Sequence, residues 1–280
     1  MTKSGTTSEI DALIVELINN NILRHTVQFL KRENGKMKPE GSGVLLCTHQ
    51  KHFILTASHV AEYLEKDSHQ LYIRVGKKEF INVIGDIKFT SIGMSNGIDL
   101  AYIKIDDEML PSLSKPYKFV NIDKVRNPNK RLEAMNYCVL GFPETNVKRY
   151  KGVFDTGANF YLTSAANDKP YRYYKYDPNN FFLVDMKGKG THIETGKLRK
   201  VSSHFYGISG GGLWYLIYSR NSRTGKFSID YRLIGIMTEF KDPAQQFNKY
   251  YCLVGNKMHL IIDAFTAIEG FKYNIKLVND

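Results

Sequence analysis

The glycine-rich run Gly207-Ile208-Ser209-Gly210-Gly211-Gly212 is the most informative feature of the sequence. It places a serine hydroxyl on a glycine-rich turn, where backbone N–H groups act as hydrogen-bond donors. Its meaning depends on two upstream segments, Leu55-Thr56-Ala57-Ser58-His59-Val60 and Gly97-Ile98-Asp99-Leu100-Ala101. Together the three segments give the order His, Asp, Ser along the chain.

The order of His59, Asp99 and Ser209 along the chain distinguishes between the classes of hydrolase that use a catalytic triad. Two-barrel serine proteases use this order, whereas α/β-hydrolases run Ser, Asp, His and subtilisins run Asp, His, Ser. At these residues the sequence resembles the trypsin-like (chymotrypsin-fold) family of serine peptidases. The resemblance implies an all-β fold of two six-stranded antiparallel β-barrels, and a serine endopeptidase that cuts a protein substrate through an acyl-enzyme at the cleft between them.

The three residues can supply the parts of a nucleophilic site. A serine hydroxyl is a weak nucleophile near neutral pH, so it needs a base at hydrogen-bond distance and an acid that orients the base. We expect His59 to take the Ser209 proton and later protonate the leaving amine, while Asp99 binds the other ring nitrogen. The resemblance assigns the oxyanion hole to the backbone N–H groups of Gly207 and Ser209.

The segment Thr238-Glu239-Phe240 is the predicted substrate strand. By resemblance, these residues pair with the substrate as an added β-strand. We expect the Thr238 hydroxyl to bind the Asp99 carboxylate and Phe240 to narrow the specificity pocket.

Two positions depart from the secreted digestive members of the family. Ile208 stands where those enzymes carry the Asp that pairs with a freshly cut N-terminus, so we expect no activation of that kind. Activity is then constitutive, or a loop or an activating partner sets the oxyanion hole. Ser203 replaces the Asp that selects basic side chains in trypsin, so no preference for Lys or Arg is expected. His204 is a candidate for the pocket wall, the alternative being a loop residue without a substrate role.

The same glycine-rich run also satisfies the Gly-x-Ser-x-Gly pattern of a nucleophile elbow. That alternative needs a downstream acid and histidine, which Asp230 or Asp242 with His259 would provide. It also needs a helix directly after the serine, whereas Leu213-Trp214-Tyr215-Leu216-Ile217 is typical of a strand. The two-barrel interpretation is therefore favoured.

Apolar alternation divides the chain into five regions. Ser8 as N-cap and the spacing of apolar residues over 9–19 predict an N-terminal helix, and 258–265 has helical periodicity. The first-barrel strands are expected at 26–30, 43–47, 53–55, 71–75, 80–84 and 100–105, and the second-barrel strands at 137–141, 159–163, 181–185, 213–218, 231–238 and 250–254. The predicted boundaries are 1–21 for the helical extension, 22–115 for the first barrel, 116–134 for the linker, 135–256 for the second barrel and 257–280 for the C-terminal helix and tail.

The composition limits the compartment and the cofactors. Cys47, Cys138 and Cys252 each lie within an apolar run, and an odd, sparse count favours buried free thiols in a reducing cytoplasm over a disulfide framework. Neither a signal peptide nor a transmembrane segment is indicated. The histidines show no metal-ligand spacing with Cys or Glu, so we expect no metal and no cofactor.

The formal net charge of +11 leaves one competing class of function. A basic surface attracts nucleic acid or an acidic partner, and Tyr171-Arg172-Tyr173-Tyr174-Lys175-Tyr176 interleaves aromatic with basic residues. The competing class is a catalytically silent protease-fold module that binds nucleic acid or a protein partner. Dispersed Lys and Arg favour a solvated surface, and the favoured prediction remains an endopeptidase with a narrow regulatory role.

Overall fold

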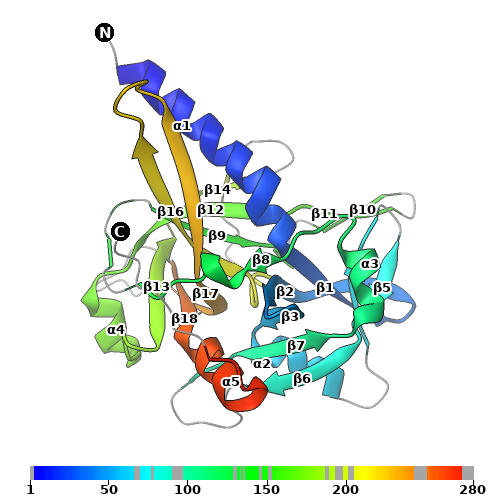
Figure 1. Cartoon of the computed structure of the whole chain (residues 1–280). Helices are drawn as coiled ribbons and strands as arrows, with labels where there is room; N and C mark the ends of the chain where they lie inside the picture. Colours follow the sequence, from blue (N-terminus) through cyan, green and yellow to red (C-terminus); the bar gives the residue numbers. More distant parts are fainter. Residues whose placement is uncertain are drawn as a thin grey trace.

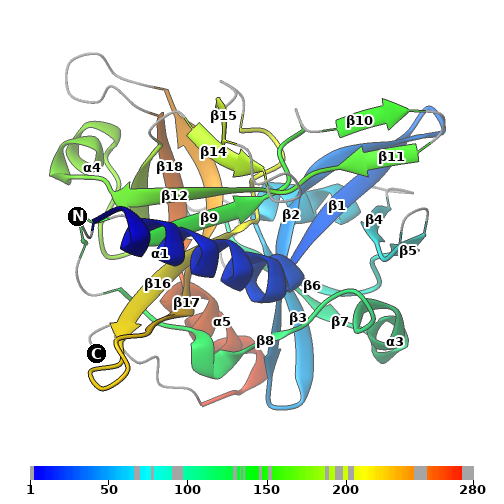
Figure 2. The same cartoon turned by 90° about the horizontal axis from the view of Figure 1, so that it is seen from above.

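Two antiparallel β-sheets lie side by side in the computed structural model, with short helices at both ends of the chain (Figures 1 and 2). The structure describes residues 3–65, 70–76, 79–89, 97–128, 131–132, 134, 136–144, 147–150, 153–186, 189–192, 198–200, 205–242 and 251–272. The predicted all-β architecture with two antiparallel sheets is thereby confirmed.

The first sheet is an open half-barrel in which the strands follow the order β5-β4-β1-β2-β3-β7-β6. β8 pairs in parallel with β2 outside this path. Asn34 and Gly35 both have positive φ, at 50° and 71°, which gives the two-residue turn that matches the twist of the β1–β2 hairpin. The strands are β1 (Thr26–Glu33), β2 (Lys36–Thr48), β3 (Lys51–Thr56), β4 (Leu71–Arg74), β5 (Phe80–Asn82), β6 (Gly85–Phe89), β7 (Ala101–Ile105) and β8 (Val120–Asn121).

The second sheet closes into a ring of six strands. The order is β13-β18-β17-β16-β9-β12, and β12 pairs back onto β13, with β14 and β15 added beside β12. β10 (Val147–Tyr150) and β11 (Val153–Thr156) form a separate hairpin. The ring and its extension comprise β9 (Tyr137–Gly141), β12 (Asn159–Ala165), β13 (Phe181–Met186), β14 (Lys189–His192), β15 (Leu198–Lys200), β16 (Gly212–Arg220), β17 (Phe227–Lys241) and β18 (Tyr251–Lys257).

The longer helices pack against these sheets. α1 (Lys3–Leu17) continues as a turn over Ile18–Ile22 and lies beside the β16–β17 hairpin (Figure 1), while α5 (His259–Glu269) follows β18. The shorter helices are α2 (Ser58–Ala61), α3 (Leu110–Leu113) and α4 (Asp168–Tyr174). The C-terminal helix is thus present as predicted. Ser8 is not the N-cap of the first helix, because α1 already begins at Lys3.

A shared apolar core joins the two sheets. Phe53 of β3 contacts Tyr102 of β7 and Phe265 of α5, at ring distances of 5.6 and 4.7 Å. Trp214 of β16 belongs to the same cluster and is fully buried. The sheets therefore cannot separate without exposing large aromatic side chains to water.

Several strands escaped prediction because their sequences lack a strong apolar alternation. These are β6, β8, β10, β11, β14 and β15; β8 has only two residues, and the other five are short and carry charged residues or glycine. β8 falls within the predicted linker.

The three cysteines are all free thiols. Cys138 and Cys252 are buried as predicted, but Cys47 is only half-buried, which corrects the expectation for that residue. Cys47 pairs with His52 close to the turn that joins β2 to β3, and its side chain is therefore partly exposed at the end of the hairpin.

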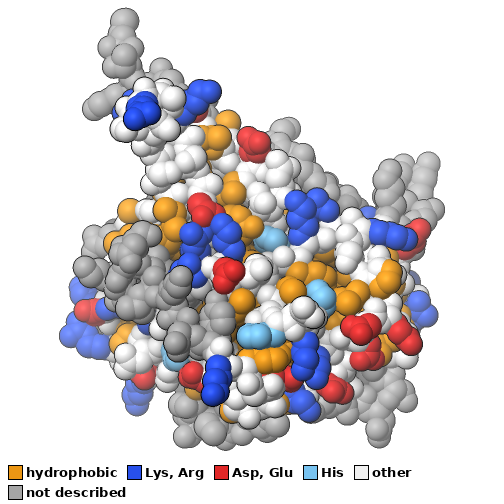
Figure 3. Space-filling model, in the orientation of Figure 1, with side chains coloured by type: hydrophobic (Ala, Val, Ile, Leu, Met, Phe, Trp, Pro, Cys, Tyr) orange, Lys and Arg blue, Asp and Glu red, His pale blue; other side chains and the backbone are white. Residues whose placement is uncertain are grey.

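The basic side chains are scattered on the face shown in Figure 3. On this face, Lys and Arg lie among Asp and Glu and do not gather in a single patch. In the described part of the chain, no helix combines the length and the apolar character needed to cross a membrane.

Replacing the aromatic side chain at the junction of the sheets should destabilise the whole chain. Phe53 is fully buried, so Phe53→Ala leaves a cavity and should lower the free energy of unfolding by about 3–5 kcal/mol. Urea denaturation followed by circular dichroism measures this loss. Phe53→Leu, which refills most of the volume, should lose clearly less, and equal losses for the two variants would contradict this account.

Candidate active site

Strand pairing in the first sheet brings His59 and Asp99 together. β3 ends at Thr56 and β7 begins at Ala101, and these two residues are direct partners in the antiparallel ladder. The chain therefore leaves β3 and enters β7 at the same edge of the sheet. His59 lies in α2 just after β3, and Asp99 lies two residues before β7.

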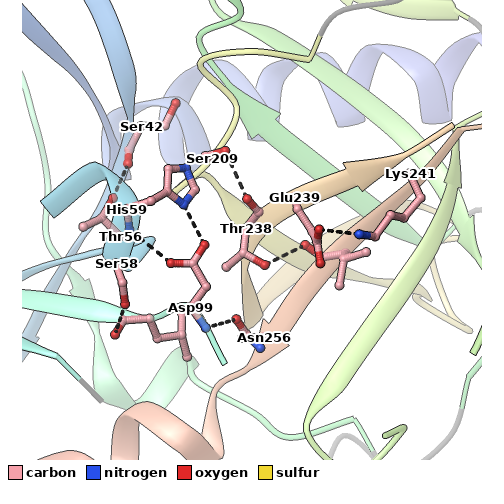
Figure 4. A network of polar contacts seen from close by, with 12 residues as sticks. Ser42, Thr56, Ser58, His59, Asp99, Ser209, Thr238, Glu239, Lys241 and Asn256 are labelled. Carbon is pink, nitrogen blue, oxygen red and sulfur yellow. Dashed lines mark hydrogen bonds and ion pairs between the residues drawn. The ribbon is translucent and has the colours of Figure 1, made fainter. Parts of the chain in front are cut away.

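His59 and Asp99 form a charge-assisted pair (Figure 4). Nδ1 of His59 lies 2.6 Å from Oδ2 of Asp99, and the backbone N–H of His59 donates to Oδ1 at 3.1 Å. With the Nδ1–H bound by the carboxylate, Nε2 carries the lone pair and can accept a proton.

Asp99 is itself held from both sheets. Its backbone N–H donates to Oδ1 of Asn256 at 3.2 Å, and its carbonyl accepts the N–H of Ser58 at 3.3 Å. Asn256 is fully buried and belongs to β18 of the second sheet. No local pattern in the sequence could assign Asn256 to this site, because 157 positions separate it from Asp99.

The pKa of His59 is raised above its ordinary value. Burial by itself would lower this pKa, but the hydrogen bond and the negative charge of Asp99 outweigh burial. Glu62 and Glu40 add smaller contributions in the same direction. The carboxylate thus stabilises the protonated ring, which is the form that a general base produces.

Ser209 lies in the same cleft as His59, but its hydroxyl points elsewhere in this structure. Its Oγ donates to the carbonyl oxygen of Thr238 at 3.2 Å (Figure 4). Among the described residues, that carbonyl is the one partner of the hydroxyl, and no hydrogen bond joins Ser209 to His59. A rotation about the Cα–Cβ bond is needed to aim Oγ at the ring.

Two backbone N–H groups beside Ser209 are suited to bind an anionic oxygen. Those of Gly207 and Ser209 have no acceptor within the part of the chain that the structure describes. Gly207 has φ of +90°, and a Cβ there would lie 2.4 Å from the carbonyl oxygen of Phe142. Glycine is therefore required at this position both by the backbone conformation and by the space available.

Ser42 of β2 holds this turn in place and was missed by the sequence analysis. Its Oγ donates to the carbonyl of Gly207 at 2.6 Å and accepts the N–H of Phe142 at 3.2 Å. Its own N–H donates to the carbonyl of Ser209 at 2.7 Å. Ser42 is fully buried, so one residue of the first sheet fixes two peptide groups of the turn in the second.

His59, Asp99, Gly207 and Ser209 line one cleft of about 750 Å³. One wall comes from the β1–β2 hairpin and carries Lys31, Glu33, Lys38 and Glu40, which form ion pairs with one another. The opposite wall comes from the 205–209 turn and from the end of β17.

The predicted substrate strand, Thr238 to Phe240, belongs to that opposite wall. Glu239 and Phe240 pair with β18, whereas the pairing of β17 with β16 ends at Ile236. The predicted bond between Thr238 and Asp99 is wrong: the Thr238 hydroxyl donates to the carbonyl of Val254 at 3.3 Å, because its side chain is buried against β18.

The remaining predicted site residues are the two pocket candidates and the members of the nucleophile-elbow alternative. Ser203 and His204 lie outside the described residues. The nucleophile-elbow alternative is wrong, because the turn leads into the strand β16 and not into a helix. Its other members have different partners, with His259 bound to Asn180 and Asp230 bound to Lys124.

Removing the negative charge of Asp99 should lower the pKa of His59. In Asp99→Asn, burial remains while its main opposing contribution is lost, so the pKa should fall below the ordinary value of about 6.5. Ring-proton titration by NMR measures the change. Glu62→Gln, the matched control, should lower the pKa by less, and an unchanged pKa in Asp99→Asn would show that the carboxylate does not stabilise the protonated ring.

Comparison with known proteins finds similar solved structures but no relative by sequence. No protein-family model and no curated protein matches the chain. Among solved structures, the chain is similar to neuropsin, a serine protease expressed in the limbic system of mouse brain, with 16% sequence identity and a TM-score of 0.49. The match covers 88% of this chain and 93% of that one. The chemistry of the cleft is therefore inferred from its own side chains.

Proposed function

We propose that this chain is a serine endopeptidase that hydrolyses peptide bonds of a protein substrate through Ser209, His59 and Asp99. The observation that carries the proposal is the 2.6 Å pair between His59 and Asp99 in the same cleft as Ser209, beside two N–H groups that have no acceptor among the described residues. Base, orienting acid, hydroxyl and oxyanion donors are the four parts that acyl transfer requires.

Acylation begins when the Ser209 hydroxyl leaves the Thr238 carbonyl and turns to Nε2 of His59. His59 takes the proton as Oγ attacks the substrate carbonyl carbon, and Asp99 stabilises the resulting imidazolium. The N–H groups of Gly207 and Ser209 bind the oxygen that becomes negative, and each such donor is typically worth 10²–10³ in rate. The C–N bond then breaks as His59 gives its proton to the leaving amine.

Deacylation repeats these steps with water as the nucleophile. His59 takes a proton from water, the hydroxide oxygen attacks the ester carbon, and the Oγ–C bond breaks as the proton returns to Ser209. The products are a carboxylic acid and the free enzyme, so the cycle needs no further reactant.

The 207–209 turn is held by contacts that the folded chain already contains. Ile208 is buried among apolar side chains of the second sheet, where the secreted digestive members of the resembled family rely on an ion pair. Ser42 binds the carbonyls of Gly207 and Ser209. These contacts support constitutive activity.

A fluorophosphonate probe tests the proposed chemistry directly. The probe should label Ser209 in the purified chain, and labelling should disappear in Ser209→Ala and fall by about 10⁴-fold or more in His59→Ala. Mass spectrometry identifies the modified peptide. Ser219, exposed on β16, serves as the control hydroxyl and should stay unmodified.

Absence of labelling in a sample shown to be folded would contradict the proposal. The chain would then be better described as a protease-fold module that binds a partner through its basic surface. Salt-sensitive binding that Ser209→Ala leaves unchanged would support that description.

Ser42→Ala should lower turnover without preventing substrate binding. The variant loses the bond to the carbonyl of Gly207, whose peptide group lies between the two that carry the N–H donors, and misplacement of this kind costs on the order of 10²-fold. The loss should appear in kcat with little change in KM, because the donors act mainly on the developing negative charge. Ser42→Thr keeps the hydroxyl and should recover part of the rate; equal losses in both variants would argue for a packing effect alone.

A further inference from the structure

A small hollow opens beside Ser209 on the side away from His59. It holds only about 10 Å³, and it shares five residues with the large cleft, so it is continuous with the candidate active site. Its lining is apolar apart from Ser209, Thr238 and Glu239; the complete set is Phe205, Ile208, Ser209, Met237, Thr238, Glu239, Phe240 and Leu253.

The proposed reaction decides which part of a substrate faces this hollow. His59 protonates the leaving nitrogen, so the leaving half of the substrate lies on the His59 side of Ser209. The residue that forms the acyl-enzyme therefore lies on the opposite side, next to Thr238 and Phe240. With its carbonyl oxygen on the N–H groups of Gly207 and Ser209, its side chain is directed at the hollow.

Aromatic rings close the hollow to large side chains. The ring of Phe240 lies 5.5 Å from that of Phe205 and 5.9 Å from that of Tyr206, the latter in an edge-to-face contact. Phe205 is only 3% exposed and Ile208 only 2%, so neither can move aside without disturbing the core. A space of this size accepts one water molecule or a methyl group.

The charge next to the hollow does not favour a basic side chain. Glu239 is the one carboxylate in the described lining, and it is already bound. Its Oε2 pairs with Nζ of Lys241 at 2.7 Å, and the hydroxyl of Tyr176 donates to its Oε1. A lysine or arginine of the substrate would have to compete with Lys241 and Tyr176 for this carboxylate.

We infer that Phe240 determines specificity by restricting the acyl residue of the substrate to a small apolar side chain, with alanine the best fit. This inference rests on the proposed function. The rings of Phe205, Tyr206 and Phe240 exclude aromatic and long aliphatic side chains by volume. The paired Glu239 removes the attraction that would otherwise select Lys or Arg.

A set of fluorogenic peptides that differ only in the acyl residue tests the inference. The wild-type chain should cleave the alanine peptide with kcat/KM about 100-fold or more above the phenylalanine and lysine peptides, which is the discrimination that a filled apolar pocket provides. Phe240→Ala should raise kcat/KM for the phenylalanine peptide by about 10–100-fold while changing the alanine peptide little.

Two further variants keep the result interpretable. Phe240→Val retains an apolar side chain if Phe240→Ala fails to fold, and it should shift the preference toward side chains of intermediate size. Phe227→Ala removes the same ring at the opposite end of β17 and should leave the order of substrates unchanged.

The outcomes separate this inference from the proposed function. Equal cleavage of the alanine and phenylalanine peptides by the wild-type chain, or an unchanged order of substrates in both Phe240 variants, overturns the specificity role of Phe240 while fluorophosphonate labelling of Ser209 still stands. Absence of both cleavage and labelling in a folded sample overturns the proposed function and this inference together.

Discussion

The hydrogen bonds between Ser42 and the 207–209 turn are the contact on which the cleft depends. Ser42 is built into β2 of the first sheet, whereas the turn leads into β16 of the second. Its N–H binds the carbonyl of Ser209 at 2.7 Å and its hydroxyl binds that of Gly207 at 2.6 Å. These carbonyls belong to the 207–208 and 209–210 peptide groups, which lie on either side of the 208–209 peptide that carries the Ser209 N–H. The geometry of the candidate oxyanion hole is thus a property of how the two sheets meet.

Space at this junction explains why glycine occurs where it does. A Cβ at Gly210 would lie 1.9 Å from the carbonyl oxygen of Ser42 and 2.3 Å from the hydroxyl of Thr56. The N–H of Gly210 also donates to the carbonyl of Met237 at 2.7 Å. The turn can approach both β2 and β17 only because this residue has no side chain. Close packing and hydrogen bonding impose the same requirement here.

The cleft combines a polar side with an apolar side. His59 and Asp99 are held by the pairing of β3 with β7, and Asn256 reaches them from the other sheet. Phe205 and Phe240 cover the far side of Ser209 with rings that belong to the core of the second sheet. Because the polar groups are bound and the apolar groups are packed, the candidate site is largely formed in the chain on its own. Of the groups in the proposed reaction, the Ser209 hydroxyl is the one that has to turn.

Apolar alternation predicted most of the central strands, because a strand that is buried on one face must alternate. Helical periodicity predicted the helix after β18. Short strands such as β10 and β14 gave no such signal. Their pairing depends on backbone hydrogen bonds, which any sequence can make, and not on a buried face.

The sequence by itself determined the candidate reacting residues, since His59, Asp99 and Ser209 stand in short motifs whose order has a chemical meaning. Only the tertiary structure decided which residues support them. Ser42 and Asn256 lie in ordinary strand sequences, and they reach the site because two sheets meet there. The expected bond from Thr238 to Asp99 failed for the same reason, since the Thr238 side chain turns toward β18. Side-chain chemistry can be read from a motif, but the direction in which a side chain points is set by the packing around it.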